Sequence, residues 1–183
     1  MSAPAERTDA QVVRDVLAGD RDAYRLLVRR YGDVLYGHAL RMVRSPDEAS
    51  DLAQRALVKG YRKLSSCRDR DRVGAWLFRI LSNLTKDHLR SRRRTSISLD
   101  RLEELPEQGG GPLEAAHRGE VRGRLRLALA QLTPDQREAF MLKHVEGRSY
   151  EEMAAVLDAS VASLKMRVHR ARDALQELLE DFR

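Results

Sequence analysis

The chain has 183 residues, of which 34% are charged and only 5% aromatic, with a formal net charge of +6 and a pI of about 9.8. So few aromatic residues exclude a core built on large rings and favour helices packed through Leu, Val, Ala and Ile. The basic excess favours a polyanionic partner. The single cysteine, Cys67, excludes an intrachain disulfide, while a redox-sensing thiol and a spectator thiol both stay open.

Charge divides the chain into three parts. Residues 1–94 hold 21 Lys/Arg against 12 Asp/Glu, residues 95–117 hold 1 against 5, and residues 118–183 hold 12 against 11. The middle part contains Gly109-Gly110-Gly111-Pro112, which cannot lie inside a helix. No segment alternates with a period of two. We therefore predict an all-α protein of two small helical domains, 1–94 and 118–183, joined by a flexible acidic linker at 95–117.

The first domain is expected to begin after a frayed end at residues 1–8. Asp9 is a suitable N-cap for a helix over 10–18. A long apolar stripe with a period of 3.6 residues then predicts a helix from about Arg21 to Val43.

A helix over about 46–64 follows, with Ser45 as N-cap and Pro46 at the first helical position. The outward side of its first two turns is acidic and polar, although the domain around it is basic. Such a face needs a basic partner, because DNA would repel it. The outward residues are Asp47, Glu48, Asp51 and Gln54.

A polar loop at 65–72 leads into an amphipathic helix from Val73 to Arg94, which ends in a basic run. One side should pack in a core, and the other offers cations and the amide of Asn83 to a polyanion. A core helix with a merely solvated basic face is the alternative. The inward residues are Val73, Trp76, Leu77, Ile80, Leu81, Leu84 and His88, and the outward ones are Ala75, Arg79, Ser82, Lys86 and Arg90.

In the second domain, a helix over about 118–132 comes first, and the next helices have clear capping signals. The capping box at 133–136 predicts a helix through about Val145, and a second capping box at 149–152 predicts a short one. A turn at 158–160 separates the short helix from a last helix. This order is a helix-turn-helix.

The last helix, from about Val161, should bury one apolar side and expose a side rich in cations. Cations around a small residue near the helix N-terminus suit a major groove. An ordinary solvated C-terminal helix is the alternative. The exposed side holds Ala162, Ser163, Met166, His169 and Arg170, with Lys165 and Arg167 at its flanks.

Three stretches together resemble the extracytoplasmic-function group of bacterial sigma factors. They are SPDEASDLAQRALVKGYRKL (45–64), VGAWLFRILSNLTKDHLRSRRR (73–94) and LTPDQREAFMLKHVEGRSYEEMAAVLDASVASLKMRVHRARDAL (132–175). The specific part is the W-L-x-x-I-x-x-N-x-x-x-D-x-x-R spacing ahead of an LTPDQRE helix-turn-helix. The resemblance covers nearly the whole chain. It implies a subunit that binds core RNA polymerase as a monomer and directs promoter-specific initiation of transcription.

The resemblance also implies a role for each surface. The acidic helix would dock on the clamp helices of the polymerase β′ subunit, with the β flap as a further contact. The loop and the basic helix would hold the melted −10 strand, and the last helix would read the −35 duplex. The clamp set is Asp47, Glu48, Asp51, Leu52 and Gln54; the −10 set is Arg68, Arg70, Arg72, Trp76, Arg79, Asn83, Lys86 and Arg90; the −35 set is Ser163, Lys165, Met166, Arg167, His169, Arg170 and Arg172.

The chain departs from the family pattern at two places. Met166 replaces a small polar reader, which points to a thymine methyl or a sugar. Ser50 stands where the family prefers Glu, which leaves Glu48 and Asp51 more of the clamp contact. Trp76 is expected to be a packing anchor more than a stacking platform. In the family the linker threads the RNA exit path, and a plain spacer is the alternative.

No histidine pairs with Cys67 or another histidine at metal-ligand spacing, and the glycine run lacks a phosphate-binding context. The sequence shows no targeting segment and no apolar run near the roughly 20 residues of a membrane span. We expect a cytoplasmic protein without catalysis, metal or cofactor. A stand-alone helix-turn-helix regulator and a sequestering interaction module are the competing readings. An anti-sigma partner is implied by the resemblance alone.

Overall fold

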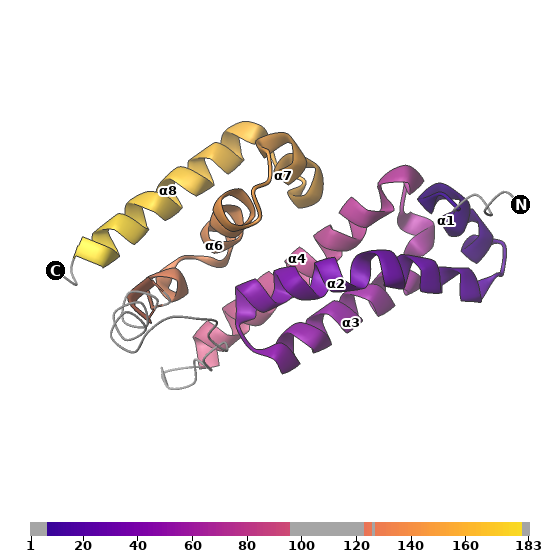
Figure 1. The fold of residues 1–183 in the computed structure, drawn as a ribbon, viewed down its shortest axis with the longest axis horizontal. Coiled ribbons are helices and arrows are strands. Elements are labelled where there is room, and N and C mark those ends of the chain that lie inside the picture. Colours follow the sequence, from indigo (N-terminus) through magenta and orange to yellow (C-terminus); the bar gives the residue numbers. More distant parts are fainter. Residues whose placement is uncertain (1–6, 96–122, 126, 181–183) are drawn as a thin grey trace, which may run out of the picture. The chain divides into compact units, whose positions relative to one another are not determined.

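The computed structural model of the chain describes residues 7–95, 123–125 and 127–180. Within these ranges every regular element is helical and none is a strand (Figure 1). The chain forms two compact units, Met1–His88 and Leu89–Arg183. The predicted all-α class is confirmed, whereas the acidic linker lies, apart from Thr95, outside the described residues.

Among the described residues of the first unit, four α-helices and three short 3₁₀ turns begin. The division between the units falls inside the fourth helix, so the domain bounds predicted from charge stay a prediction. The elements are α1 (Asp9–Leu17), η1 (Arg21–Ala23), α2 (Tyr24–Val43), α3 (Pro46–Arg62), η2 (Leu64–Ser66), η3 (Arg70–Arg72) and α4 (Val73–Thr95).

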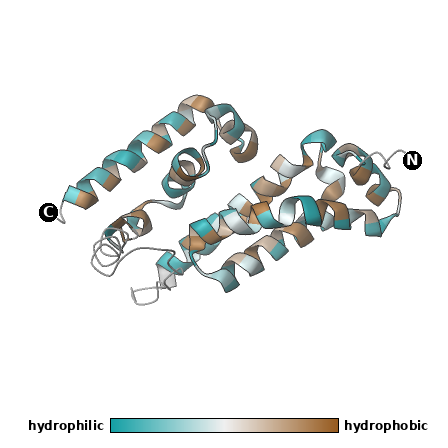
Figure 2. Ribbon diagram, viewed as in Figure 1, coloured by the Kyte–Doolittle hydropathy of each residue, from teal (hydrophilic) through white to brown (hydrophobic). Residues whose placement is uncertain are grey.

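The core of the first unit lies between α2, α3 and α4. Helix α3 packs along α2, and the Tyr24 hydroxyl donates a hydrogen bond of 2.8 Å to the Leu57 carbonyl. Helix α4 approaches closely at Gly60, where an added Cβ would lie 2.3 Å from Leu77 Cδ2. Figure 2 shows apolar residues recurring between hydrophilic ones along the helices. Each fully buried leucine contributes about 1.5–3 kcal/mol, so this packing stabilises the unit.

The cap of α1 differs from the prediction. Thr8 is the N-cap: its side chain accepts from the Gln11 backbone N–H, and the Gln11 side chain accepts from the Thr8 N–H. Asp9 is the first helical residue, and its carboxylate is engaged elsewhere. The expectation of a frayed end is therefore wrong for Arg7 and Thr8. By contrast, Ser45 and Pro46 open α3 as predicted.

The second unit contains a helical segment over 123–131, with residue 126 outside the description, and four further elements. Arg137 donates hydrogen bonds of 2.9 Å to the carbonyls of Leu129 and Ala130, and so caps the C-terminal end of that segment. The further elements are α6 (Pro134–Phe140), η4 (Met141–Val145), α7 (Tyr150–Leu157) and α8 (Val161–Glu180).

The helix predicted through Val145 changes its winding after Phe140. Residues 141–145 form a π-helical turn, closed by a hydrogen bond of 2.9 Å from the Glu146 N–H to the Met141 carbonyl. Gly147 then has φ +68°, which ends the segment. Both predicted capping boxes are present, at Thr133 and at Ser149.

The turn between α7 and α8 has the short geometry of a helix-turn-helix. Asp158 is left-handed, with φ 54°, and it ends α7. The Ser160 hydroxyl accepts a hydrogen bond of 3.2 Å from the Ser163 N–H and so caps α8. The predicted inward side of α8 is confirmed, since Leu164, Val168 and Ala171 are all buried.

Candidate nucleic-acid interfaces

The first turns of α3 present the acidic face expected from the sequence. Asp47, Asp51 and Gln54 are exposed, and Glu48 is half-buried. Asp47 and Glu48 lie in the first turn, where the positive end of the helix dipole favours carboxylates. Leu52 is different, because it is 1% exposed and packs in the core. Leu52 can therefore support this face from below but cannot contact a partner.

Two carboxylates of the acidic face have partners within the first unit. Glu48 Oε2 lies 3.3 Å from His88 Nε2 on α4. Asp51 Oδ2 lies 3.2 Å from Arg55 Nη1, one turn further along α3, and both side chains are more than half exposed. An exposed pair of this kind is worth about 0.3–0.5 kcal/mol, so the Asp51 carboxylate can readily exchange Arg55 for a stronger partner.

The loop at 65–72 is held at few points. Cys67 is buried in it, next to the buried Leu64 that precedes the loop, and the Cys67 thiol donates to the Asp69 carbonyl at 3.3 Å. Burial and, second, the Asp69 carboxylate raise the pKa of the Cys67 thiol, which disfavours the thiolate. The exposed residues include three cations of the predicted −10 set, namely Arg68, Arg70 and Arg72.

The outward side of α4 is narrower than the sequence pattern suggested. Asn83 and Arg90 are exposed, as expected. Ser82 is 1% exposed and Lys86 is 9% exposed, so the prediction that both lie on the outward side is wrong. The apolar stripe of α4 did not include Phe78, yet Phe78 is buried, with its ring 4.5 Å from the ring of His38. Packing on two sides of α4 explains this difference.

Trp76 and Arg79 lie half-buried at the edge of that helix. A Cβ added to Gly60 of α3 would lie 3.7 Å from an indole carbon of Trp76, so the indole packs near α3. This contact supports the packing role expected for Trp76.

Helix α8 projects a continuous polar surface away from the core of the second unit. Lys165, His169 and Arg170 are exposed, and Met166 is 51% exposed. Met166 is a single exposed apolar side chain on this face, which a protein surface tolerates. Of the other predicted −35 residues, Arg172 is exposed, and Ser163 and Arg167 are half-buried.

Several of these side chains are held in place by neighbours. His169 Nδ1 lies 2.8 Å from Asp173 Oδ2, and Arg167 Nη1 lies 3.8 Å from Asp135 Oδ1. The sequence did not identify Tyr150 as a neighbour of the predicted DNA-reading residues. The Lys165 ammonium lies 5.8 Å from the centre of the Tyr150 ring. This contact orients a predicted reader from the first turn of α7.

An apolar groove lies on the second unit between the 123–131 segment, α6 and α8. Leu125 and Leu179, which line it, are exposed, and Phe140 in its lining packs against the buried core. Arg172, Gln176 and Glu180 add a polar edge.

Within the described ranges, no three His, Cys, Asp or Glu side chains are arranged to hold a metal ion. Among the helices that the structure describes, none is both long and apolar enough to cross a membrane.

Known proteins similar to this chain match both units. Residues 27–95 match the family described as sigma-70 region 2, and residues 122–175 match that described as sigma-70, region 4. The chain is 34% identical to the RNA polymerase sigma-H factor of Pseudomonas aeruginosa, over 96% of this chain and 95% of the relative. It is also 34% identical to the ECF RNA polymerase sigma-E factor of Escherichia coli K12, over 94% and 95% of the two chains.

Solved structures with a similar fold include two complexes. CnrH in complex with the cytosolic domain of CnrY is 29% identical, with a TM-score of 0.62 over 94% of this chain and 97% of that one. The sigma factor RpoE in complex with the anti-sigma factor NepR from Bartonella quintana is 31% identical. Its TM-score is also 0.62, over 87% of this chain and 98% of that one.

Proposed function

The chain belongs to the extracytoplasmic-function group of the sigma-70 family, and from that premise we propose which of its surfaces performs each step of initiation. As an alternative sigma factor, it directs promoter-specific transcription by core RNA polymerase. We assign docking and capture of the −10 strand to residues 1–94, reading of the −35 duplex to 118–183, and a connecting role to 95–117.

We assign polymerase docking to the acidic face of α3. Its exposed residues are Asp47, Asp51 and Gln54, with Glu48 beside them. A negative surface on a basic DNA-binding protein would weaken DNA binding. The presence of such a surface therefore favours a cationic protein partner. The clamp helices of the β′ subunit are the partner implied by the family.

We assign capture of the melted −10 strand to the loop at 65–72 and the exposed part of α4. Arg68, Arg70 and Arg72 would contact phosphates, and the Asn83 amide can donate to and accept from an unpaired base. Unstacking one base costs a few kcal/mol, which these contacts must offset. Trp76 and Arg79 would support the strand site from the helix edge, and Lys86 contributes less because it is buried.

We assign reading of the −35 duplex to α8. A helix with an exposed polar side and a buried apolar side fits the major groove, where Arg and Lys donate to guanine edges. Lys165, Met166, His169 and Arg170 would face the bases. Arg167 and Arg172 would lie nearer the phosphates, with Ser163 at the N-terminal end of the helix.

Two further partners are part of the proposal. The apolar groove beside α6 and α8 suits an apolar protein segment, and the β flap is the expected occupant. An anti-sigma protein would hold the chain inactive, since both similar solved structures pair a relative of this chain with another protein. The chain would act in the bacterial cytoplasm, at the nucleoid when active, without an enzymatic reaction or a cofactor.

One observation carries the proposal: a single small unit joins an exposed acidic helix end to an exposed arginine loop. A regulator that binds only duplex DNA needs neither. The test is transcription in vitro with bacterial core polymerase and mapping of start sites. The proposal predicts start sites that require both components. DNA binding and regulation without any joining to the core enzyme would instead indicate a stand-alone regulator.

A further inference from the structure

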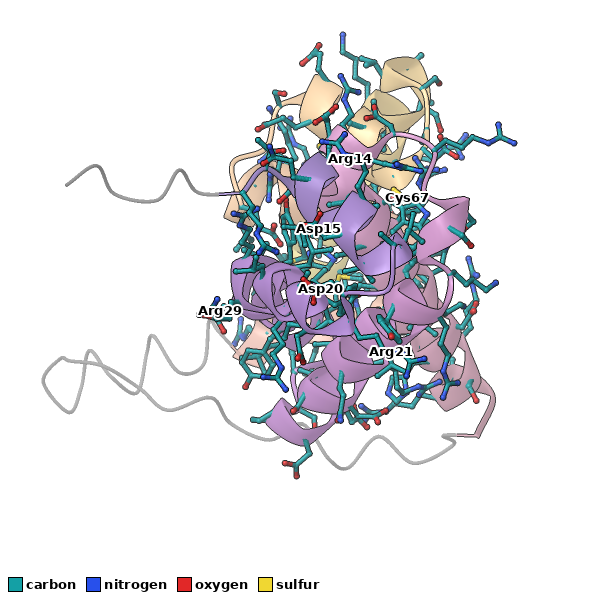
Figure 3. All side chains as sticks on the ribbon, turned by 90° about the vertical axis from the view of Figure 1, so that its right-hand side faces the viewer. Arg14, Asp15, Asp20, Arg21, Arg29 and Cys67 are labelled. Carbon is teal, nitrogen blue, oxygen red and sulfur yellow. The ribbon has the colours of Figure 1, made fainter. Side chains whose placement is uncertain are left out.

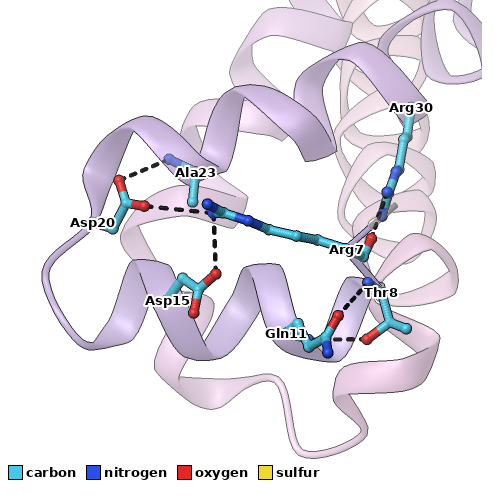
Figure 4. Close-up of polar contacts among 7 residues, drawn as sticks. All are labelled: Arg7, Thr8, Gln11, Asp15, Asp20, Ala23 and Arg30. Atoms are coloured by element: carbon cyan, nitrogen blue, oxygen red, sulfur yellow. Dashed lines mark hydrogen bonds and ion pairs between the residues drawn. The ribbon is translucent and has the colours of Figure 1, made fainter. Parts of the chain in front are cut away.

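The N-terminus of the first unit is tied down by a polar network. Arg7 Nη1 lies 3.1 Å from Asp15 Oδ2 and 3.6 Å from Asp20 Oδ2, so it bridges α1 and the start of η1 (Figure 4). The capping box of Thr8 and Gln11 lies beside it. The network fixes a helix of only nine residues, which would be marginal by itself.

Asp9 is the centre of a second set of contacts, between α1 and α2. Its Oδ1 accepts a hydrogen bond of 2.6 Å from Arg30 Nη1, and its Oδ2 accepts one from the Tyr31 hydroxyl. The side chains of Asp9 and Arg30 are 16% and 24% exposed. Arg30 Nη2 also donates to the Arg7 carbonyl at 2.6 Å (Figure 4). A mostly buried, charge-assisted pair of this kind is stronger than a surface ion pair.

Tyr31, which bonds to Asp9, also contacts the beginning of α4. A Cβ added to Gly74 would lie 2.3 Å from Tyr31 Cε1 and 2.8 Å from its hydroxyl oxygen, so the phenol rests directly on the Gly74 backbone. Gly74 is the second residue of α4, immediately after the loop at 65–72. Burial and, second, the hydrogen bond to Asp9 raise the pKa of Tyr31 to about 12, so its hydroxyl remains a donor at neutral pH.

Helix α1 also packs against the loop itself. It contacts η2 and η3, which form the two ends of the loop. Figure 3 views this end of the unit, with Arg14 and Asp15 of α1 and Cys67 of the loop labelled. The loop is therefore enclosed by α1 on one side and by the Tyr31–Gly74 contact where α4 begins.

We propose that Asp9 and Tyr31 are positioning residues for capture of the melted −10 strand: they fix α1 and the first turn of α4 around the loop, so that its arginines face the strand in one arrangement. This inference rests on the function proposed above for the loop. Within the loop at 65–72 only Cys67 is buried, so the packing of the loop depends largely on the elements around it. Ordering a loop before binding lowers the entropic cost of binding.

The test compares four full-length variants bound to core polymerase. Asp9→Asn removes the charge, and Tyr31→Phe removes the hydroxyl but keeps the ring on Gly74. Asp22→Asn, at an 81%-exposed side chain, and Tyr36→Phe, elsewhere on α2, are the matched controls. A fluorescent single strand from a mapped promoter reports −10 binding.

The first two variants should bind the −10 strand about 3- to 10-fold more weakly, the size of one net hydrogen bond. Core binding and −35 duplex binding should match the controls. The lost contacts lower the melting temperature of the first unit, so strand binding is compared at a temperature at which every variant is folded. Should Asp9→Asn fail to fold, Tyr31→Phe alone decides. Unchanged strand binding, or an equal loss of core and −35 binding, would overturn the inference.

A variant with Arg68, Arg70 and Arg72 all changed to Gln separates the inference from the proposed function. If this variant loses strand binding while Asp9→Asn and Tyr31→Phe do not, only the positioning role fails. If the triple variant also binds the strand normally, the function assigned to the loop is wrong.

Discussion

The two regions to which we assign DNA reading in this sigma factor differ in how they are built. Helix α8 is a single helix of 20 residues with one buried side, so its polar side is in place before DNA binds. The proposed −10 region is a loop between two helices, and part of the cationic side of α4 is buried, as Lys86 shows. A regular duplex can be read by a rigid helix, whereas a flexible strand needs a loop that other elements hold in position.

The difference extends to the other partners. The first unit carries the exposed acidic residues Asp47 and Asp51 beside its arginine loop, and the second carries an apolar groove beside its reading helix. Each unit therefore combines a proposed DNA surface with a surface suited to protein. Strand capture by the first unit should consequently depend on docking, while duplex reading should survive without it.

The largest expected effect comes from Asp51→Arg, which should abolish core binding. The change puts an arginine at position 51, one turn before Arg55 on α3. The helix then presents a positive face to a basic partner. Repulsion along the helix costs only a few tenths of a kcal/mol, so the unit should still fold. Binding to labelled core polymerase and melting of the free protein measure the two effects. Asp22→Arg is the control, and normal core binding by Asp51→Arg would refute the clamp assignment.

Arg170→Ala tests the second unit in the same way. Loss of a base contact should weaken −35 binding by about 1–3 kcal/mol and relax the preference at one base pair. Competition among promoter duplexes that differ at single positions measures the change. An unchanged ranking of these duplexes would remove Arg170 from the reading surface.

Arg172→Ala should have a smaller and less selective effect. A lost phosphate contact weakens binding to all sequences similarly and lowers the slope of log affinity against log salt by about 1. Titration of duplex at several salt concentrations checks this. A changed sequence preference would place Arg172 at a base and not at the backbone.

Ser149→Ala tests whether the second unit folds around its helix-turn-helix. The hydroxyl accepts from the Glu152 N–H at 3.1 Å, and loss of such a cap costs about 1 kcal/mol. The melting temperature of the second unit should fall while core binding by the first stays unchanged. Ser50→Ala, at an exposed position inside α3, is the control. An equal effect of the two changes would contradict the importance of the cap.

The smallest effect concerns the first unit at alkaline pH. The pKa of Tyr31 is about 12, above its ordinary value of 10, because burial and Asp9 disfavour the phenolate. Its contribution to stability is therefore complete below pH 10 and is lost as the pH rises through 12. In denaturant unfolding, the free energy of unfolding of Tyr31→Phe should therefore fall less steeply between pH 10 and pH 12 than that of the unchanged protein. An equally steep decline would contradict the Asp9–Tyr31 contact.

The sequence predicted those features that depend on near neighbours in the chain. Ser45, Thr133 and Ser149 were identified as caps because each bonds a residue three positions away. The sides of α8 were also predicted correctly, since that helix buries only one stripe. Thr8 was missed although Gln11 completes the same pattern, because the first residues were expected to be frayed.

Features that need contacts between distant elements could not be predicted. Lys86 and Ser82 lie on the polar side of the α4 pattern, yet packing on more than one side buries them. The contact of Asp9 with Tyr31 joins residues 22 positions apart, and no periodicity marks it. The resemblance supplied the roles of the surfaces, and these assignments await the experiments above.

Permanganate reactivity of the −10 thymines tests the central claim most directly, with the protein alone, core polymerase alone and both together on a mapped promoter. The account predicts reactive thymines only when both are present, and their loss with the Arg68, Arg70 and Arg72 to Gln variant while the −35 duplex stays protected. Reactive thymines with the protein alone, or unchanged opening by that variant, would contradict it.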